Sequence, residues 1–284
     1  MPLVTMGNVL RNAMKGKYAV GAFNADNLEM IQAFVRAAED ERAPVILQIS
    51  QSAISYAGME TAAALARFEG TRAVVPVVVH LDHGMNYVQN VQALKAGVIC
   101  LGIDAAMLPY EENLAKSKAV CALAHAAGLE AEAGLGFVPD SKENPSAEEV
   151  EANKTHPGQL EEFVAVTGVD LVPVALGSMR GMRQRTIDLD LDLLAELRHR
   201  VSVPFVLHGA SGIRLESIQE AIGFGVCKVN MAACFDKRFT ETLRKELAAH
   251  PNEIHFRPLT AAAREAVRAE ARQQIRLLGG SNQV

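Results

Sequence analysis

Two histidines in this sequence each follow a short apolar run, at the point where a buried strand would end. One lies in Val77-Val-Val-His-Leu-Asp-His-Gly84, and the other in Phe205-Val-Leu-His-Gly-Ala-Ser-Gly212. A neutral imidazole binds metals and also accepts protons near neutral pH. Asp82 lies directly beside His83, where a carboxylate can move a proton next to a metal ligand. The pattern predicts a metal-assisted or acid–base centre built on His83, His208 and Asp82.

A third apolar run ends in an arginine instead of a histidine. Residues 170–177 are largely apolar and lead into Ser178-Met-Arg-Gly181, which places Arg180 near the end of another predicted strand. A guanidinium remains cationic and cannot coordinate zinc. The sequence therefore predicts a fixed positive charge close to the two histidines.

The remaining predicted strands also end in polar residues. These are Asn24, Ser50, Asp104, Glu132 and Asn230. The C-terminal ends of parallel strands in a barrel meet at one face, so we expect these side chains to converge on one pocket. The glycine-rich turn Gly209-Ala-Ser-Gly212 precedes a predicted helix, a junction that suits phosphate binding by backbone amides.

The succession of apolar runs predicts an α/β fold, a (β/α)8 TIM barrel. Runs rich in valine, isoleucine and leucine alternate with amphipathic stretches, as buried parallel strands alternate with crossover helices. The predicted strands are residues 19–23, 45–48, 77–81, 99–103, 129–132, 171–176, 205–207 and 228–230. The predicted helices are residues 28–41, 59–69, 87–95, 110–127, 160–166, 191–200, 215–223 and 235–249. A chain of 284 residues suits one such barrel, so we expect a single domain over residues 1–284.

Three segments lie outside the eight strand–helix units. Residues 1–17 are expected to form a helix at the N-terminal end of the barrel, and residues 259–278 a final amphipathic helix. Residues 138–159 are polar and rich in proline and acids, which predicts a long mobile loop after the fifth strand.

Composition excludes several classes of partner. The formal net charge of -5, with 28 basic residues dispersed among 33 acidic ones, argues against a nucleic-acid surface. No apolar run approaches the ~20 residues needed to cross a bilayer, so we expect no membrane segment. The four cysteines form no CxxC pair, which favours reduced thiols and a cytoplasmic location.

The motifs together resemble the class II, zinc-dependent ketose-bisphosphate aldolases, which include the fructose- and tagatose-bisphosphate aldolases. The resemblance runs nearly from end to end of the chain. Its motifs include Ala22-Phe-Asn24, His80-Leu-Asp-His83, Leu108-Pro-Tyr-Glu-Glu-Asn113, Glu130-Ala-Glu132, Leu207-His-Gly-Ala-Ser-Gly212 and Lys228-Val-Asn230. The resemblance implies a lyase of carbohydrate metabolism that makes or cleaves a carbon–carbon bond in a sugar phosphate, with zinc polarising the ketone.

The resemblance also implies roles for individual residues. His83 and His208 would bind zinc, and Asp82 would act as acid and base on the substrate hydroxyl. Asp104 and Glu132 would be carboxylates near a second metal position. The substrate and its phosphate would contact Asn24, Ser50, Gly181, Gly209, Ser211 and Asn230. Arg257 resembles an arginine that reaches a phosphate site, sometimes in a neighbouring subunit, which predicts a homo-oligomer, either a dimer or a tetramer.

Four positions depart from the family pattern. The third zinc-binding histidine aligns with Arg180, and the small hydroxyl residue after Asp104 is missing in Ala105-Ala106. The acidic loop after the fifth strand reads Gly136-Phe-Val-Pro-Asp140, and the hydroxyl after the phosphate-loop asparagine is replaced in Ala232-Ala233. The changes predict a substrate other than the usual bisphosphates, with one phosphate and a carboxylate or sulfonate.

Arg180 leaves three interpretations open. The guanidinium replaces the metal as electrophile, or zinc stays on His83, His208 and an acid while Arg180 turns outward, or the site has lost catalysis and binds ligand only. The predicted function is aldol cleavage or formation through an enediolate. The alternatives are an isomerase or epimerase with the same chemistry, and a noncatalytic subunit that binds sugar phosphates.

Overall fold

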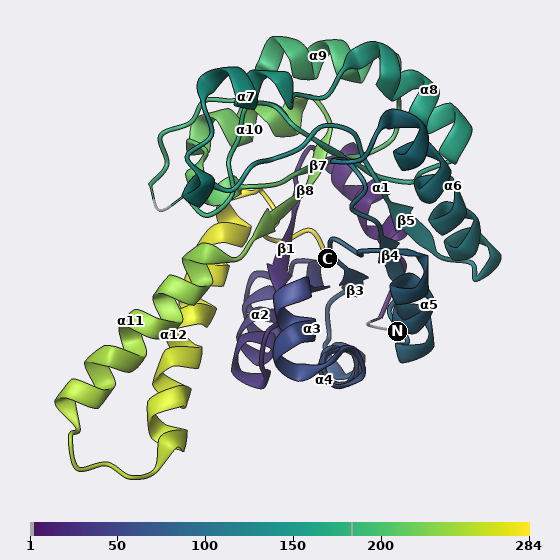
Figure 1. Ribbon diagram of the computed structural model, residues 1–284. Helices are drawn as coiled ribbons and strands as arrows, with labels where there is room; N and C mark the ends of the chain where they lie inside the picture. Colours follow the sequence, from purple (N-terminus) through teal and green to yellow (C-terminus); the bar gives the residue numbers. More distant parts are fainter. Residues whose placement is uncertain (1–2, 183) are drawn as a thin grey trace.

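A computed structural model of the chain describes residues 3–182 and 184–284. Eight parallel strands form one sheet in the order β5-β4-β3-β2-β1-β8-β7-β6. Parallel bridges between Glu132 and Leu171 and between Leu135 and Val174 bring the two edges of this sheet together. The sheet is therefore a nearly closed barrel with helices around it (Figure 1), which confirms the predicted (β/α)8 fold.

The strands and helices of the described residues alternate along the chain. The strands are β1 (Val20–Asn24), β2 (Val45–Ile49), β3 (Val77–Leu81), β4 (Cys100–Gly102), β5 (Glu130–Glu132), β6 (Val172–Val174), β7 (Phe205–Leu207) and β8 (Val226–Met231). The α-helices are α1 (Met6–Gly16), α2 (Leu28–Glu41), α3 (Gln51–Ala57), α4 (Met59–Arg72), α5 (Tyr87–Ala96), α6 (Tyr110–Ala126), α7 (Ala147–Ala152), α8 (Pro157–Thr167), α9 (Leu191–Arg200), α10 (Leu215–Gly223), α11 (Ala233–Ala249) and α12 (Phe256–Leu277). Two short 3-10 helices are η1 (Ser141–Glu143) and η2 (Ala210–Gly212).

The N-terminal part of the barrel interior is apolar and is closed by α1. Met6, Val9, Leu10 and Ala13 of α1 belong to one buried cluster with side chains of the strands. A larger cluster lies between the strands and the surrounding helices. Because these apolar layers fix the strands, polar side chains at the opposite, C-terminal ends are held in defined places.

The polar stretch at residues 138–159 is not one continuous loop. It contains η1 and α7, and α8 already begins at Pro157. Ser146 and Glu149 form a capping box, in which the serine hydroxyl accepts from the Glu149 backbone N–H and the glutamate accepts from the Ser146 N–H. This cap starts a helix in a sequence that has no apolar stripe. The mobility of the segment stays a prediction.

Helices α11 and α12 form a two-helix hairpin that extends away from the barrel (Figure 1). The base of α12 is bound to α2, where Glu41 accepts hydrogen bonds from Arg272 and Arg276. The tip carries the exposed apolar side chains Ile254 and Phe256. No helix among residues 3–182 and 184–284 is long and apolar enough to span a membrane.

Candidate active site

A cavity of about 900 Å³ opens at the C-terminal ends of the strands. It brings together most of the residues predicted from strand ends and glycine turns. These are Asn24, Ser50, Asp82, His83, Asp104, Arg180, Gly181, His208, Gly209, Ser211 and Asn230. Glu132 lies deeper, in a smaller adjoining cavity that His83, Asp104, Arg180 and His208 also line. Arg257 is exposed at the start of α12 and is not part of the described lining.

Backbone geometry directs His83 into the cavity. Its φ is 52°, in the left-handed region that few residues other than glycine adopt. The following residue must be glycine, since a Cβ on Gly84 would lie 2.0 Å from the carbonyl oxygen of Gly102. This turn between β3 and α5 therefore fixes the imidazole, which contacts the ring of His208 edge to face at a centroid distance of 4.8 Å.

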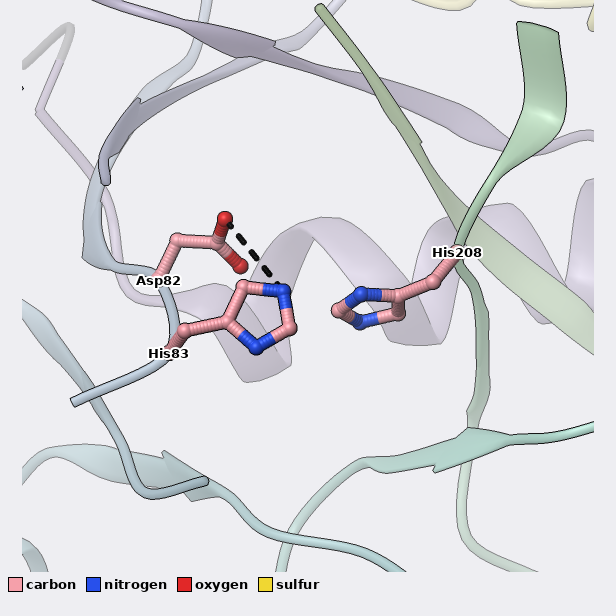
Figure 2. A group of neighbouring side chains, drawn as sticks. All are labelled: Asp82, His83 and His208. Atoms are coloured by element: carbon pink, nitrogen blue, oxygen red, sulfur yellow. Dashed lines mark ion pairs between the residues drawn. The ribbon is translucent and has the colours of Figure 1, made fainter. Parts of the chain in front are cut away.

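Two carboxylates bind the imidazole of His83. Its Nδ1 lies 2.7 Å from Oδ2 of Asp104, and its Nε2 lies 3.9 Å from Oδ2 of Asp82 (Figure 2). Burial alone would lower the pKa of His83, but the two carboxylates outweigh it and raise the pKa to about 9. Asp104 therefore orients the ring and leaves Nε2 directed toward Asp82 and His208.

Asp82 is a buried carboxylate that remains ionised. Asn230 donates a hydrogen bond from Nδ2 to Oδ1 of Asp82 at 3.2 Å. Burial would raise the pKa of Asp82, but electrostatic interactions with His83, His208, Lys228 and His80, of which His83 contributes most, outweigh it and lower the pKa. An ionised carboxylate that opens on a cavity can accept a proton from a bound hydroxyl.

Glu132 is the centre of a polar cluster beneath the cavity. Lys228 donates to its Oε2 at 2.8 Å, and Nε2 of His208 lies 3.3 Å from its Oε1. Burial would raise the pKa of Glu132, but the charge of Lys228 and the other contacts hold it well below the usual value. His80 is fully buried with Nε2 3.4 Å from Glu132, so it supports the site from within the barrel interior.

Lys228 is a functional residue that the sequence analysis did not assign. Its side chain is fully buried and also donates to Oδ1 of Asn230 at 2.8 Å. A lysine within an otherwise apolar strand was the available signal, because a buried ammonium requires an acidic partner. It holds Glu132 and Asn230 together under the cavity.

Arg180 is placed by main-chain hydrogen bonds to the segment after β5. Its N–H donates to Pro139 O at 2.8 Å, and its carbonyl accepts from Ser141 N at 2.9 Å. The guanidinium carbon lies 5.3 Å from the centre of the Phe137 ring. Its positive charge opposes protonation of His83 and favours ionisation of Asp104.

The Nε of Arg180 is buried, and it has no hydrogen-bond partner within residues 3–182 and 184–284. A buried, unsatisfied donor is rare and costs free energy unless a ligand satisfies it. Arg180 also lines both cavities. The guanidinium is therefore suited to bind an anionic group in the cavity.

Three side chains meet as a metal ion requires. One donor atom from each of Asp82, His83 and His208 lies within 4.8 Å of the others. Figure 2 shows how these three side chains lie together. A second group of the same kind, His80, Asp82 and Glu132, is fully buried. Two imidazoles with a carboxylate are an accepted donor set for a divalent transition metal. The residues present can hold such an ion, although the charge of Arg180 opposes it.

Comparisons with known proteins give the relatives of the whole chain. The model of the family "Fructose-bisphosphate aldolase class-II" matches residues 4–283. The chain is 37% identical over 284 residues to a fructose-bisphosphate aldolase of Geobacillus stearothermophilus, covering 99% of this chain and 98% of the relative. A probable fructose-bisphosphate aldolase of Bacillus subtilis is also 37% identical, over the full length of both chains.

A solved structure extends the likeness to the fold. The crystal structure of the YdjI aldolase from Escherichia coli K12 superposes with a TM-score of 0.86 and 29% identity. The match covers 99% of this chain and 98% of that chain. The sequence comparison and the structure comparison therefore both find aldolases.

Proposed function

This chain belongs to the class II fructose-bisphosphate aldolase family, and on that premise we propose that Asp82 carries the proton in its reversible aldol reaction. The family and the aldolase relatives make the chain an aldolase-type lyase that cleaves a carbon–carbon bond in a phosphorylated sugar. In the cleavage direction, Asp82 removes the proton from the hydroxyl on the carbon that becomes the aldehyde. The carbon–carbon bond between this carbon and the carbon next to the ketone then breaks. Its electron pair moves toward the ketone, which becomes an enediolate. In synthesis, Asp82 returns the proton.

The observation that carries this proposal is the position of Asp82. The carboxylate is held by Asn230 at 3.2 Å, opens on the cavity and stays ionised beside two imidazoles. A general base has to be ionised and within reach of its proton. The lowered pKa of Asp82 meets the first condition, and its place in the cavity lining supports the second.

Arg180 is proposed to bind an anionic group of the substrate. Its unsatisfied Nε and its position on both cavities support this role. A guanidinium can bind a carboxylate or sulfonate through two parallel hydrogen bonds. We therefore favour a substrate with one phosphate and a second, planar or tetrahedral anion, such as a phosphorylated keto acid.

A divalent metal, zinc in this proposal, would be held by His83 and His208, with the carboxylate of Glu132, which contacts His208, as a neighbouring acid. When bound, it would supply Lewis-acid polarisation of the ketone. Asp104 would then orient His83 through Nδ1, as outer carboxylates do for metal-binding histidines. Arg180 would weaken this site by charge repulsion.

We also propose a homo-oligomer in which Arg257 reaches a neighbouring subunit. The residue is the second of α12 and does not line the cavity of its own chain. Helices α11 and α12 form the hairpin that extends from the barrel (Figure 1). The exposed Ile254 and Phe256 beside it offer apolar contact area. A sedimentation measurement would give the number of subunits, and Arg257→Met should raise KM in the assembled protein.

A cytoplasmic location is proposed from the cysteines. Cys100, Cys121 and Cys227 are buried thiols, and Cys234 is half-buried. Unpaired thiols are typical of a reducing compartment.

The test of the activity is a panel of phosphorylated ketoses and phosphorylated keto acids, with identification of the products. Wild type should release an aldehyde from at least one compound, and Asp82→Asn should retain substrate binding without turnover. Inert, fully folded wild-type protein, with and without added zinc, would contradict the proposal. A rearranged product of unchanged carbon number would point to isomerisation instead.

A further inference from the structure

Arg185 lies behind the glycine-rich loop that borders the cavity. Its guanidinium Nη1 donates to the carbonyl oxygen of Ala210 at 2.8 Å and to that of Ile213 at 3.0 Å. Both distances are those of well-formed N–H···O hydrogen bonds. Arg185 does not line the cavity, whereas Gly209, Ala210 and Ser211 do. It therefore contacts the loop from outside the cavity.

Peptide geometry connects this contact to the cavity. In a trans peptide, the carbonyl of one residue and the N–H of the next point in opposite directions. Because the Ala210 carbonyl faces Arg185, the Ser211 N–H of the same peptide faces away from Arg185, toward the cavity that Ser211 lines. A guanidinium on the carbonyl also polarises the peptide and makes its N–H a stronger donor.

The loop itself has little freedom to take another shape. Gly209 has a φ of 74°, and a Cβ there would lie 2.7 Å from the carbonyl oxygen of Met179. The Gly212 carbonyl accepts hydrogen bonds from the N–H groups of Thr186 and Ile187. The segment that carries Arg185 thus forms the wall behind the loop.

A second set of contacts ties Arg185 to α12. Its Nη2 donates to Oε1 of Gln274 at 3.2 Å, and Gln274 donates to Glu270 at 2.8 Å. Glu270 also binds Arg238 of α11, with Nη2 2.8 Å from Oε2. The base of the hairpin therefore fixes the guanidinium, and the guanidinium fixes the loop.

We propose that Arg185 is a positioning residue that aims the Ser211 N–H at the phosphate of the substrate. It acts through the loop and touches no substrate atom. The inference rests on the proposed function only for the identity of the phosphate-bearing substrate. Binding of inorganic phosphate tests it without any turnover.

The experiment compares wild type with Arg185→Met, Arg185→Lys and Gln274→Leu. The matched control is Arg214→Met, which removes an exposed arginine near the same loop whose Nε lies 3.6 Å from Asp188. Calorimetry measures the affinity for inorganic phosphate. Steady-state kinetics with the substrate found in the panel give KM and kcat, and urea unfolding checks that each variant is folded.

Arg185→Met should weaken phosphate binding and raise KM by about tenfold to a hundredfold, which is the range expected for the loss of one hydrogen bond to a charged group. Its kcat should stay within about threefold of the wild-type value. Arg185→Lys, which keeps one donor, should fall between wild type and Arg185→Met. Gln274→Leu should show a smaller loss, because it removes only the tether. Arg214→Met should equal wild type.

Unchanged phosphate affinity in a folded Arg185→Met variant would overturn the inference. If that variant does not fold, unchanged affinity in Arg185→Lys overturns it, and a partial loss supports it. If wild type binds phosphate, Arg185→Met weakens that binding, and wild type still cleaves no sugar, the proposed function alone would be contradicted. Wild type that binds no phosphate would overturn the inference.

Discussion

Replacement of Arg180 by methionine should raise the stability of the protein and lower its activity. Methionine keeps the unbranched, flexible stem of the side chain without the guanidinium, and it leaves the main-chain hydrogen bonds of residue 180 to Pro139 and Ser141 in place. The change removes a buried Nε that has no partner in the described part of the chain, which costs wild type ~1–3 kcal/mol. It also removes the contact with Phe137, worth about 0.5–1 kcal/mol. The free energy of unfolding should therefore rise by about 1 kcal/mol.

Activity should change in the opposite direction. If Arg180 binds an anion or a developing oxyanion, its loss should lower kcat/KM by about 10²–10³, the usual effect of removing one fixed donor from such a site. Urea unfolding gives the stability, and steady-state kinetics with the substrate from the panel give the activity. A more stable but nearly inactive variant is the expected result.

Arg198 provides the control, because it has the same kind of aromatic contact without a role in the cavity. Its guanidinium carbon lies 4.5 Å from the centre of the Phe205 ring, and Nη1 donates to Val203 O at 3.1 Å. Arg198→Met should lose stability and keep activity. The reasoning would be refuted if Arg180→Met behaved like this control, destabilised by 2 kcal/mol or more with full turnover.

Three further perturbations follow from the same geometry. Arg180→His removes a positive charge and adds an imidazole, so elemental analysis after purification without chelator should find at least tenfold more bound zinc than in wild type. Asp82→Asn should lower kcat by about 10²–10⁴ with ligand affinity retained, because the general base is lost; calorimetry and kinetics together test this. Glu41→Gln should lower stability at pH 7 by about 2 kcal/mol, since hydrogen bonds from Arg276 and Arg272 outweigh burial and lower the pKa of Glu41 from 4.5 to about 2. The pKa of Glu41 is lower in the folded state than in the unfolded state, so the stability difference between wild type and Glu41→Gln is complete above pH 4.5 and disappears as the pH falls toward 2. Urea unfolding at pH 7 and pH 3 would show this loss.

The barrel could be predicted from the sequence because buried parallel strands are short apolar runs. All eight predicted strands exist, and their ends differ by a few residues; the last strand is Val226–Met231 instead of 228–230. Helices α3 and α7 were not predicted, because neither has an apolar stripe. Both depend on serine caps, Ser50 and Ser146, whose hydroxyls accept backbone N–H groups. Short helices that depend on a cap show little hydrophobic periodicity, so the sequence pattern does not reveal them.

The gathering of polar strand ends into one cavity could also be predicted, but the contacts between them could not. That Asp104 binds His83 instead of pointing elsewhere depends on the positive φ of His83, which sequence does not reveal. The pairing of Lys228 with Glu132 joins residues 96 positions apart. Arg185 lies in an irregular segment with no periodicity, so its hydrogen bonds to the loop carbonyls had no signal at all.

The charges around His83 determine how readily the site can bind a metal ion. The carboxylates of Asp82, Asp104 and Glu132 face two fixed cations, Lys228 and Arg180, so one further positive charge neutralises the group. His83 supplies it, since its pKa of about 9 keeps the imidazole protonated at neutral pH. A divalent ion would have to displace that proton and would leave the site with a net positive charge. Zinc uptake by wild type should therefore release protons and strengthen as the pH rises toward 9, whereas Arg180→His, with one fixed cation fewer, should bind zinc at neutral pH.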